Sequence, residues 1–125
     1  PTGGGLFRSV DGGIHWEELY TCYCRAVWLD PDDHDHLIFG PADSVDSGGR
    51  IEESVDGGHT WRFASLGLDV PWRRHMVERF VPFRDAIVAV LSNGHVVQAE
   101  LPDLAWRRVL RDTLDVNAVA ILAAE

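Results

Sequence analysis

The chain lacks any apolar stretch that could cross a lipid bilayer. No run approaches the roughly 18 apolar residues that a membrane-spanning helix needs. The start also lacks a basic and then apolar segment with a small-residue cleavage site, so no signal peptide is visible. We therefore expect no membrane insertion. Because the first residue is Pro1 and not Met, we expect the chain to begin inside a longer protein.

Basic residues are outnumbered by acidic ones. The 11 Lys and Arg residues stand against 20 Asp and Glu residues, which gives a formal net charge of −9. A general nucleic-acid binder needs a basic face to displace counterions from phosphate, so we expect no nucleic-acid partner. Acidity mainly predicts solubility. The 125 residues, 46% hydrophobic and 25% charged, are typical of one soluble globular domain.

Cysteine is scarce, and the two cysteines, Cys22 and Cys24, are separated only by Tyr23. On a strand their side chains would share a face at about 7 Å, too far for an unstrained disulfide. We interpret them as reduced, buried thiols, which favours a cytoplasmic location. The alternative, a metal-binding pair, lacks a second ligand pair at useful spacing. We expect no metal and no cofactor.

A sustained helical period is also missing, and a repeat takes its place. Trp16, Trp61 and Trp106 are spaced by 45 residues each time. The first two close the octapeptides SVDGGIHW, at 9–16, and SVDGGHTW, at 54–61. Before Trp106 the spacing persists, but the Ser, the turn Asp and the Gly pair are absent. Such a period predicts a repeat architecture.

Each octapeptide has the chemistry of a tight turn between two strands. The Asp can accept hydrogen bonds from turn amides, and the Ser can add another. The two Gly residues supply positive φ angles without steric cost, and the Trp can pack over the turn. The predicted structural residues are Ser9, Asp11, Gly13, Trp16, Ser54, Asp56, Gly58 and Trp61.

The pattern Ser-x-Asp-x-Gly-x-x-Trp resembles the Asp box of the sialidase-like BNR repeat, one of the WD40/YVTN/BNR-like repeats of β-propellers. The stretches at 5–9 and 30–33 are similar to the flanks of that repeat. The resemblance covers nearly the whole chain and implies a β-propeller fold. It implies no particular activity, because Asp boxes occur in proteins with many functions and usually lie away from any active site.

Strand patterns recur in a fixed order around these turns. We predict strands at 5–9, 16–19, 25–29, 36–42, 50–54, 61–64, 77–81, 86–91, 95–100, 105–110 and 116–122. As four-stranded antiparallel blades, they make a half blade (1–20), full blades at 21–66 and 67–112, and one inner strand of a further blade at 113–125.

A propeller needs about 4–8 blades to close. We therefore interpret the all-β chain as a propeller fragment of about two and a half blades. The remaining blades would come from the parent protein or, alternatively, from further copies of the chain.

Propeller sites usually gather on the loop face opposite the Asp boxes, here the loops at 20–25, 43–49, 69–78, 92–95 and 112–117. The richest loop follows Asp69. Our predicted binding residues are Arg25, Asp43, Trp72, Arg73, Arg74, His75 and Glu78. Stacking and bidentate hydrogen bonds from such residues suit an anionic or sugar-like ligand. The alternative is a structural connection, in which Arg and Glu pair with each other and Trp72 packs on the next blade.

The short segment Asp32-Asp33-His34-Asp35-His36 suggests a metal site, because two His residues at i and i+2 could share an ion. It also fits the polar turn that this repeat type places between its first two strands. We predict solvated turn residues there, and we predict that His15 and His59 are exposed in their turns.

Three functions remain open. The leading hypothesis is a non-catalytic propeller that binds a small molecule, a glycan or a protein through its loop face, and for it we assign no catalytic residue. The second is an exo-acting, sialidase-like glycoside hydrolase with its catalytic residues partly in missing blades. The candidates for sialidase chemistry are the cations Arg25, Arg50, Arg73 and Arg74 and the phenols Tyr20 and Tyr23. Another glycoside hydrolase, with paired carboxylates, would instead use Asp43, Asp46, Glu52 and Glu53. The third is an assembly factor for membrane complexes.

Overall fold

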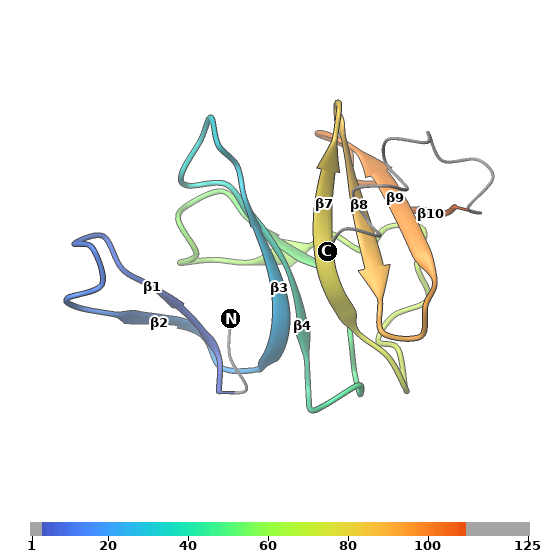
Figure 1. The fold of residues 1–125 in the computed structure, drawn as a ribbon, viewed down its shortest axis with the longest axis horizontal. Helices are drawn as coiled ribbons and strands as arrows, with labels where there is room; N and C mark the ends of the chain where they lie inside the picture. The colour runs from blue at the N-terminus through green and yellow to red at the C-terminus, as the bar shows by residue number, and fades with distance from the viewer. Residues whose placement is uncertain (1–3, 110–125) are drawn as a thin grey trace.

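The computed structural model describes residues 4–109, and within that range the chain is all-β, with no helix (Figure 1). No helix long and apolar enough to cross a membrane occurs in this part. The strands are β1 (Leu6–Arg8), β2 (Glu17–Tyr20), β3 (Tyr23–Leu29), β4 (Leu37–Ala42), β5 (Glu52–Ser54), β6 (Arg62–Phe63), β7 (Val77–Phe83), β8 (Ala86–Leu91), β9 (Val96–Glu100) and β10 (Arg107–Arg108).

The strands form three antiparallel sheets. β1 and β2 make a two-stranded hairpin, and two four-stranded sheets have the orders β3-β4-β5-β6 and β10-β9-β8-β7. Chain order is thus retained across each sheet, as in a simple meander. The predicted strand at 86–91 has the observed bounds of β8, whereas the strand predicted at 105–110 shrinks to the two residues of β10. The predictions at 112–117, 113–125 and 116–122 lie outside the described residues.

β8 shows why an unbroken apolar run becomes a strand here. It is an interior strand between β7 and β9, and its backbone groups pair on both edges. Ile87, Ala89 and Leu91 point into the main core, and Val88, on the opposite face, is also buried. A strand covered on both faces needs apolar residues at successive positions, whereas a half-exposed strand needs alternation.

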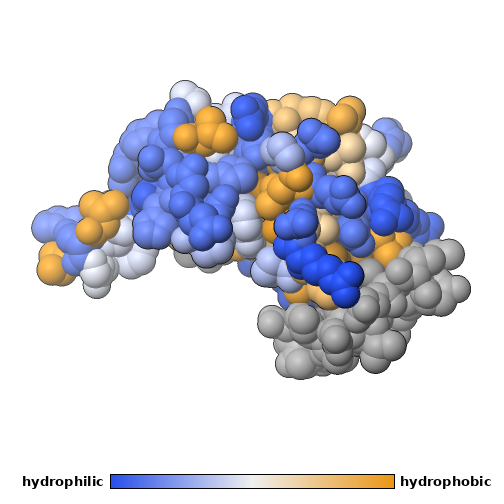
Figure 2. All heavy atoms as spheres, turned by 90° about the horizontal axis from the view of Figure 1, so that it is seen from above, coloured by the Kyte–Doolittle hydropathy of each residue, from blue (hydrophilic) through white to orange (hydrophobic). Residues whose placement is uncertain are grey.

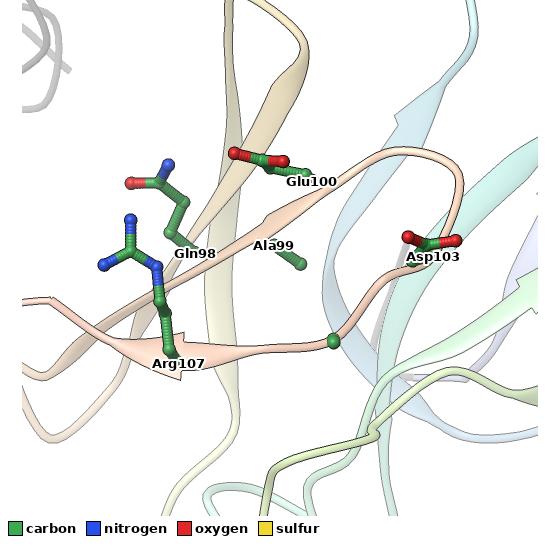
Figure 3. Close-up of a pocket in the computed structure, with 6 residues that line it drawn as sticks. Gln98, Ala99, Glu100, Asp103 and Arg107 are labelled. Atoms are coloured by element: carbon green, nitrogen blue, oxygen red, sulfur yellow. The ribbon is translucent and has the colours of Figure 1, made fainter.

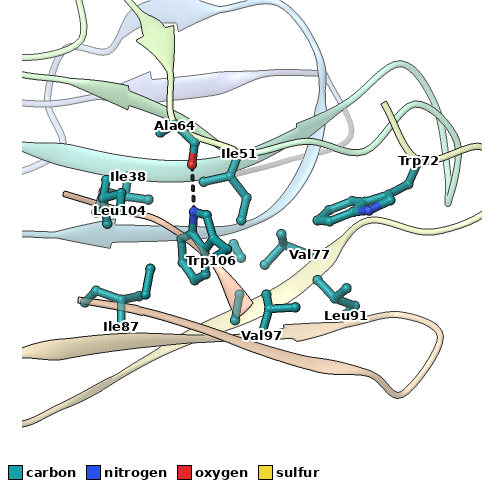
Figure 4. Close-up of a cluster of buried hydrophobic side chains, with 13 residues drawn as sticks. Ile38, Ile51, Ala64, Trp72, Val77, Ile87, Leu91, Val97, Leu104 and Trp106 are labelled. Carbon is teal, nitrogen blue, oxygen red and sulfur yellow. Dashed lines mark hydrogen bonds between the residues drawn. The ribbon is translucent and has the colours of Figure 1, made fainter. Parts of the chain in front are cut away.

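The main core lies between the two four-stranded sheets (Figure 4). Ile38 and Ile51 approach from the first sheet, and Val77 and Ile87 approach from the second. Trp106 fills the space between them, and its indole Nε1 donates a hydrogen bond of 2.7 Å to the Ala64 carbonyl. This buried contact joins the end of the second sheet to the end of the first.

A smaller apolar cluster joins the β1–β2 hairpin to the other face of the first sheet. Leu6, Cys24 and Phe39 form its buried centre. The rings of Tyr20 and Trp61 pack on Phe39, with centroid distances of 5.0 and 4.4 Å. In Figure 2 the hairpin projects from the body as an arm with hydrophobic side chains near its tip. The hairpin is therefore anchored at its base and open at its tip.

Candidate functional site

The predicted loop face exists as one end of the molecule. The connections at 21–22, 43–49, 69–76 and 92–95 all lie at the lower end in Figure 1, away from the turns at 9–16 and 54–61. We call this end the loop end. The residues predicted to bind there fall into three groups. Some are hydrogen-bonded to other side chains, some are buried or half-buried, and some are exposed without an ion-pair partner among residues 4–109.

Arg25 is the centre of the first network. Its guanidinium Nη1 donates a hydrogen bond of 2.8 Å to Asp46 Oδ1 and another to Glu78 Oε1. Its Nε donates to the Tyr23 hydroxyl at 3.3 Å. The contacts with Tyr23 and then with Asp46 and Glu78 raise the pKa of Arg25, so the group is charged at any pH at which the protein folds. Arg25 thus joins β3, the 43–49 loop and β7.

Asp46 holds the 43–49 loop onto both sheets. Its backbone has a φ of 51°, in the left-handed region that costs energy for residues other than glycine. A hydrogen bond from the Ser92 side chain, followed by the bond from Arg25, lowers the pKa of Asp46. Gly49 also forms a backbone bridge with Trp72. The loop end is therefore fastened across the two sheets.

Asp43 does not join Arg25, contrary to the predicted site. Its carboxylate accepts a hydrogen bond of 3.2 Å from Arg50 Nη1. Arg50 also donates from Nε to Glu52 at 2.9 Å and from Nη2 to the Tyr20 hydroxyl at 3.0 Å. The Tyr20 hydroxyl donates in turn to Glu52 at 2.8 Å, and burial raises the pKa of Tyr20. Arg50, which the binding prediction left out, thus forms a second network.

Trp72 is not the exposed stacking residue of the binding interpretation; it packs inward, as in the structural alternative. The indole is 8% exposed and belongs to the main core. His75 stacks on the ring at a centroid distance of 4.8 Å, and burial lowers the pKa of His75. The sequence could not distinguish these cases, because a Trp beside three basic residues looks the same whether it faces solvent or packs inward.

Arg73 and Arg74 are the free cations of the loop end. Both side chains are exposed, and neither forms an ion pair with any of residues 4–109. They differ in this from Arg25 and Arg50, whose donors are occupied by internal acceptors. Of the predicted binding residues, these two can meet an incoming anion without first losing a partner.

Cys22 and Cys24 are free thiols, as expected. Cys24 is buried, whereas Cys22 is only half-buried, so the prediction of two buried thiols holds for one of them. A hydrogen bond with Cys24 and then burial raise the pKa of Cys22. A thiol with a raised pKa is a poor nucleophile at neutral pH.

The two repeated octapeptides form matching turns. The Ser9 and Ser54 hydroxyls accept hydrogen bonds from Gly13 N at 2.8 Å and Gly58 N at 2.9 Å. Asp11 accepts from His15 N at 2.9 Å, and Asp56 accepts from Thr60 N at 2.9 Å. In both turns the glycine pair has positive φ angles, 74° and 93° in the first and 76° and 94° in the second.

The electrostatics of the turns follow from these bonds. The backbone hydrogen bond from His15 lowers the pKa of Asp11 to about 2. The side-chain and backbone bonds from Thr60 lower the pKa of Asp56. His15 and His59 are exposed, as predicted. Trp16 is also largely exposed, whereas Trp61 is half-buried against Phe39.

His36 is a feature that the sequence analysis missed. It was predicted to be solvated, but it is half-buried between two carboxylates. Its Nδ1 lies 3.0 Å from Asp30 Oδ2, and its Nε2 lies 2.6 Å from Glu53 Oε2. Arg62 completes the group by donating to Glu53 Oε1 at 2.7 Å. His34, in contrast, is exposed as predicted.

Two cavities lined by residues within 4–109 include at most one predicted binding residue, Asp43. One of about 390 Å³ lies beside Arg50 and is lined also by Glu52, Phe63 and Val70. Another, of about 310 Å³, lies on β9 and β10 (Figure 3). There Gln98 and Arg107 are partners across the strand pair and extend to the same side of the sheet. Residues 4–109 contain no group of three or more His, Cys, Asp or Glu side chains that could hold a metal ion.

Comparison with known proteins adds no family assignment. No protein-family model matches the chain, and no curated protein sequence matches it.

Proposed function

We propose that the chain is part of a sialidase-like BNR β-propeller and serves as a non-catalytic binding or scaffold module. In this proposal the turns at 9–16 and 54–61 are Asp boxes, and each four-stranded sheet is a blade. Their matching hydrogen bonds and glycine φ angles, 45 residues apart, support a common repeat unit. The stacking of two meander sheets over one core supports a propeller arrangement.

The partner contacts the loop end and carries anionic groups. The observation that carries this proposal is the contrast between the arginines of that end. Arg25 and Arg50 are occupied by internal carboxylates, whereas Arg73 and Arg74 are exposed and unpaired within the described chain. An arginine without a partner can form bidentate hydrogen bonds to a carboxylate, sulfate or phosphate at no cost in lost ion pairs.

The carboxylates of the loop end support a non-catalytic role. Asp46 and Glu78 accept from Arg25, and Asp43 and Glu52 accept from Arg50. A glycosidase needs one carboxyl group whose pKa is raised so that it can act as an acid. For Asp46 the effect is the opposite, because hydrogen bonds from Ser92 and then Arg25 lower the pKa of its carboxyl group.

Binding of two carboxylate probes by the 125-residue chain tests this proposal. The probes are 3′-sialyllactose, followed by chemical shifts, and a fluorescein-labelled hexaglutamate peptide, followed by polarisation. We expect at least one to bind in a salt-sensitive manner. In the variant R73Q/R74Q we expect affinity to fall about tenfold, because two exposed charge contacts together contribute about 1–2 kcal/mol.

The control variant R84N/R107Q removes the same charge away from the loop end. It should bind each probe as the wild type does. Equal losses in both variants would show that only net charge matters, and this would contradict a site at the loop end. Hydrolysis of a fluorogenic sialoside, abolished by replacing a loop-end carboxylate, would favour the glycosidase hypothesis instead.

A further inference from the structure

A pocket at the edge of the first four-stranded sheet has an apolar interior and a charged rim. Its volume is about 390 Å³, which lies within the range of small-molecule sites. Ile51 and Ser65, which are fully buried, line its inner end. Phe63 of β6 forms one wall, and Val70 and Pro71, in the connection that leads to β7, complete the apolar lining. We call this cavity the Phe63 pocket.

Phe63 is an aromatic side chain that the fold leaves uncovered. It lies on β6, the edge strand of its sheet, and is 67% exposed. Its partner across the strand pair is Glu52, so the ring and the carboxylate stand on the same face of the sheet. An exposed ring that lines a pocket offers a flat apolar surface on which another ring can stack.

The inner end of the pocket favours an apolar group. The Ser65 hydroxyl already donates to the Ile51 carbonyl at 2.7 Å and accepts from the Ile51 amide at 2.9 Å. A sugar placed there would exchange its hydrogen bonds to water for a hydroxyl that is already paired, which costs free energy. A hydrocarbon ring has no such bonds to lose. The pocket therefore suits an apolar ring better than a glycan.

The rim of the pocket carries excess negative charge. Among its lining residues within 4–109, Arg50 is the one cation, and it donates to Asp43 at 3.2 Å and to Glu52 at 2.9 Å. Two carboxylates thus share one guanidinium, which leaves one negative charge uncompensated. The Asp43 side chain is 73% exposed, so its carboxylate can meet an incoming cation. An anion would be repelled at the same rim.

We propose that the Phe63 pocket binds a small aromatic amine, with its ring against Phe63 and its ammonium group at Asp43. The ring is complementary to the apolar interior, and the ammonium group is complementary to the uncompensated charge of the rim. The inference depends neither on the repeat architecture nor on an anionic partner. It adds a cation site beside the two exposed arginines of the loop end, which do not line this pocket.

Chemical-shift titration of the 125-residue chain with matched ligands tests the proposal. 2-Phenylethylamine and 3-phenylpropionate share a ring and a two-carbon linker and carry opposite charges. We expect the amine to bind saturably, with shifts centred on the amides of Glu52 and Phe63. At the same amides, 3-phenylpropionate should bind at least about tenfold more weakly, because the rim attracts one charge and repels the other. Hexylamine, which keeps the charge but has no ring, should also bind more weakly than 2-phenylethylamine.

Two variants separate the contribution of the ring from that of the charge. F63A removes the stacking surface and should weaken binding of the amine about fivefold or more. Its control is W16A, since Trp16 is an aromatic side chain of similar exposure, 63%, outside the pocket. D43N removes the exposed charge and should weaken binding about threefold. Its control is D32N, which changes an exposed carboxylate outside the pocket. Both controls should bind the amine as the wild type does.

Three results would overturn the proposal. The first is an absence of saturable amine binding at Glu52 and Phe63, and the second is equal affinity for the amine and the carboxylate at these amides. The third is an equal loss in F63A and W16A, which would show adsorption to any exposed ring. R73Q/R74Q should bind the amine at least as tightly as the wild type, and F63A should bind the carboxylate probes normally. A failure of the Phe63 pocket is thereby distinguished from a failure of the loop-end function.

Discussion

At the scale of single residues, the environment of His36 constrains its protonation. Both ring nitrogens face carboxylate oxygens, those of Asp30 and Glu53. A neutral imidazole has only one N–H donor, so only the charged ring can donate to both. Burial by itself would lower the pKa of His36, but the hydrogen bonds to Asp30 and Glu53 outweigh burial and raise it.

This arrangement predicts a pH-dependent stability. A raised pKa in the folded state stabilises the fold fully below the unfolded pKa of about 6.5, and the contribution is lost as pH rises through the folded value. We expect the urea midpoint to fall between pH 6 and 8.5 by more in the wild type than in H36Q. The control H34Q changes an exposed neighbour and should follow the wild type. Parallel curves for wild type and H36Q would show that His36 is not held charged.

At the scale of elements, the two turns share the hydrogen bonds of their serine and of their aspartate to the turn amides, but their surroundings differ. The Ser54 hydroxyl donates to Asp56 and accepts from Gly58 N, and Ser54 is 1% exposed. The second turn also contacts the hairpin, because Arg8 donates to the Gly57 carbonyl at 3.0 Å. The first turn makes the same bonds from Ser9 but is exposed over nearly its whole length.

Replacement of each serine should therefore have unequal effects. S54A removes a buried hydroxyl and leaves the Gly58 N–H without its acceptor, which should cost about 1–3 kcal/mol of unfolding free energy. S9A breaks the same bonds where water can replace the hydroxyl, so its cost should be smaller. Urea denaturation of both variants measures the difference. If S9A were as destabilising as S54A, burial would not be the cause.

The sequence predicted those features of the strands and loops that depend on neighbouring residues, and it missed those that depend on distant ones. The strand at 86–91 was predicted with its observed bounds. Its apolar run indicates a buried strand, and the turn residues Ser92-Asn93-Gly94 mark where the strand ends. The burial of Trp72 and the pairing of His36 depend instead on residues distant in the sequence, such as Gly49 and Glu53. The residues next to Trp72 and His36 in the sequence do not reveal such distant partners. The propeller itself stays a prediction.

For the candidate site, the sequence predicted which loops lie together better than it predicted which of their side chains pair with each other. Four of the five predicted loops contribute connections to the loop end, and the fifth, at 112–117, lies outside the described residues. Glu78 pairs with Arg25 of β3 and not with an arginine of its own connection, and Asp43 belongs to the Arg50 network. Each charged side chain has several opposite charges within reach. Which of them it pairs with depends on the loop geometry, which the sequence alone does not show. Arg73 and Arg74 remain the predicted residues available to a partner.

At the scale of the whole molecule, contacts in the core and at the loop end join the two four-stranded sheets. Apolar packing and the Trp106–Ala64 hydrogen bond join them at the core. At the loop end the backbone of Gly49 lies directly against that of residues 75 and 76. A Cβ atom on Gly49 would lie 2.4 Å from the His75 carbonyl oxygen and 2.6 Å from Met76 Cα. Real Cβ atoms do not approach backbone atoms so closely.

The variant G49A should therefore loosen the loop end from the second sheet. Because the atoms it meets are backbone, relief requires the 43–49 loop to move, and we expect a loss of about 1–3 kcal/mol in unfolding free energy. Hydrogen exchange at Gly48 and Trp72, whose backbones are bonded across this contact, should quicken. G94A is the matched control, since its Cβ meets nothing within 4 Å and it loses only the positive-φ preference of glycine. A milder effect of G49A than of G94A would show that this contact does not hold the sheets together, and that the apolar core alone does.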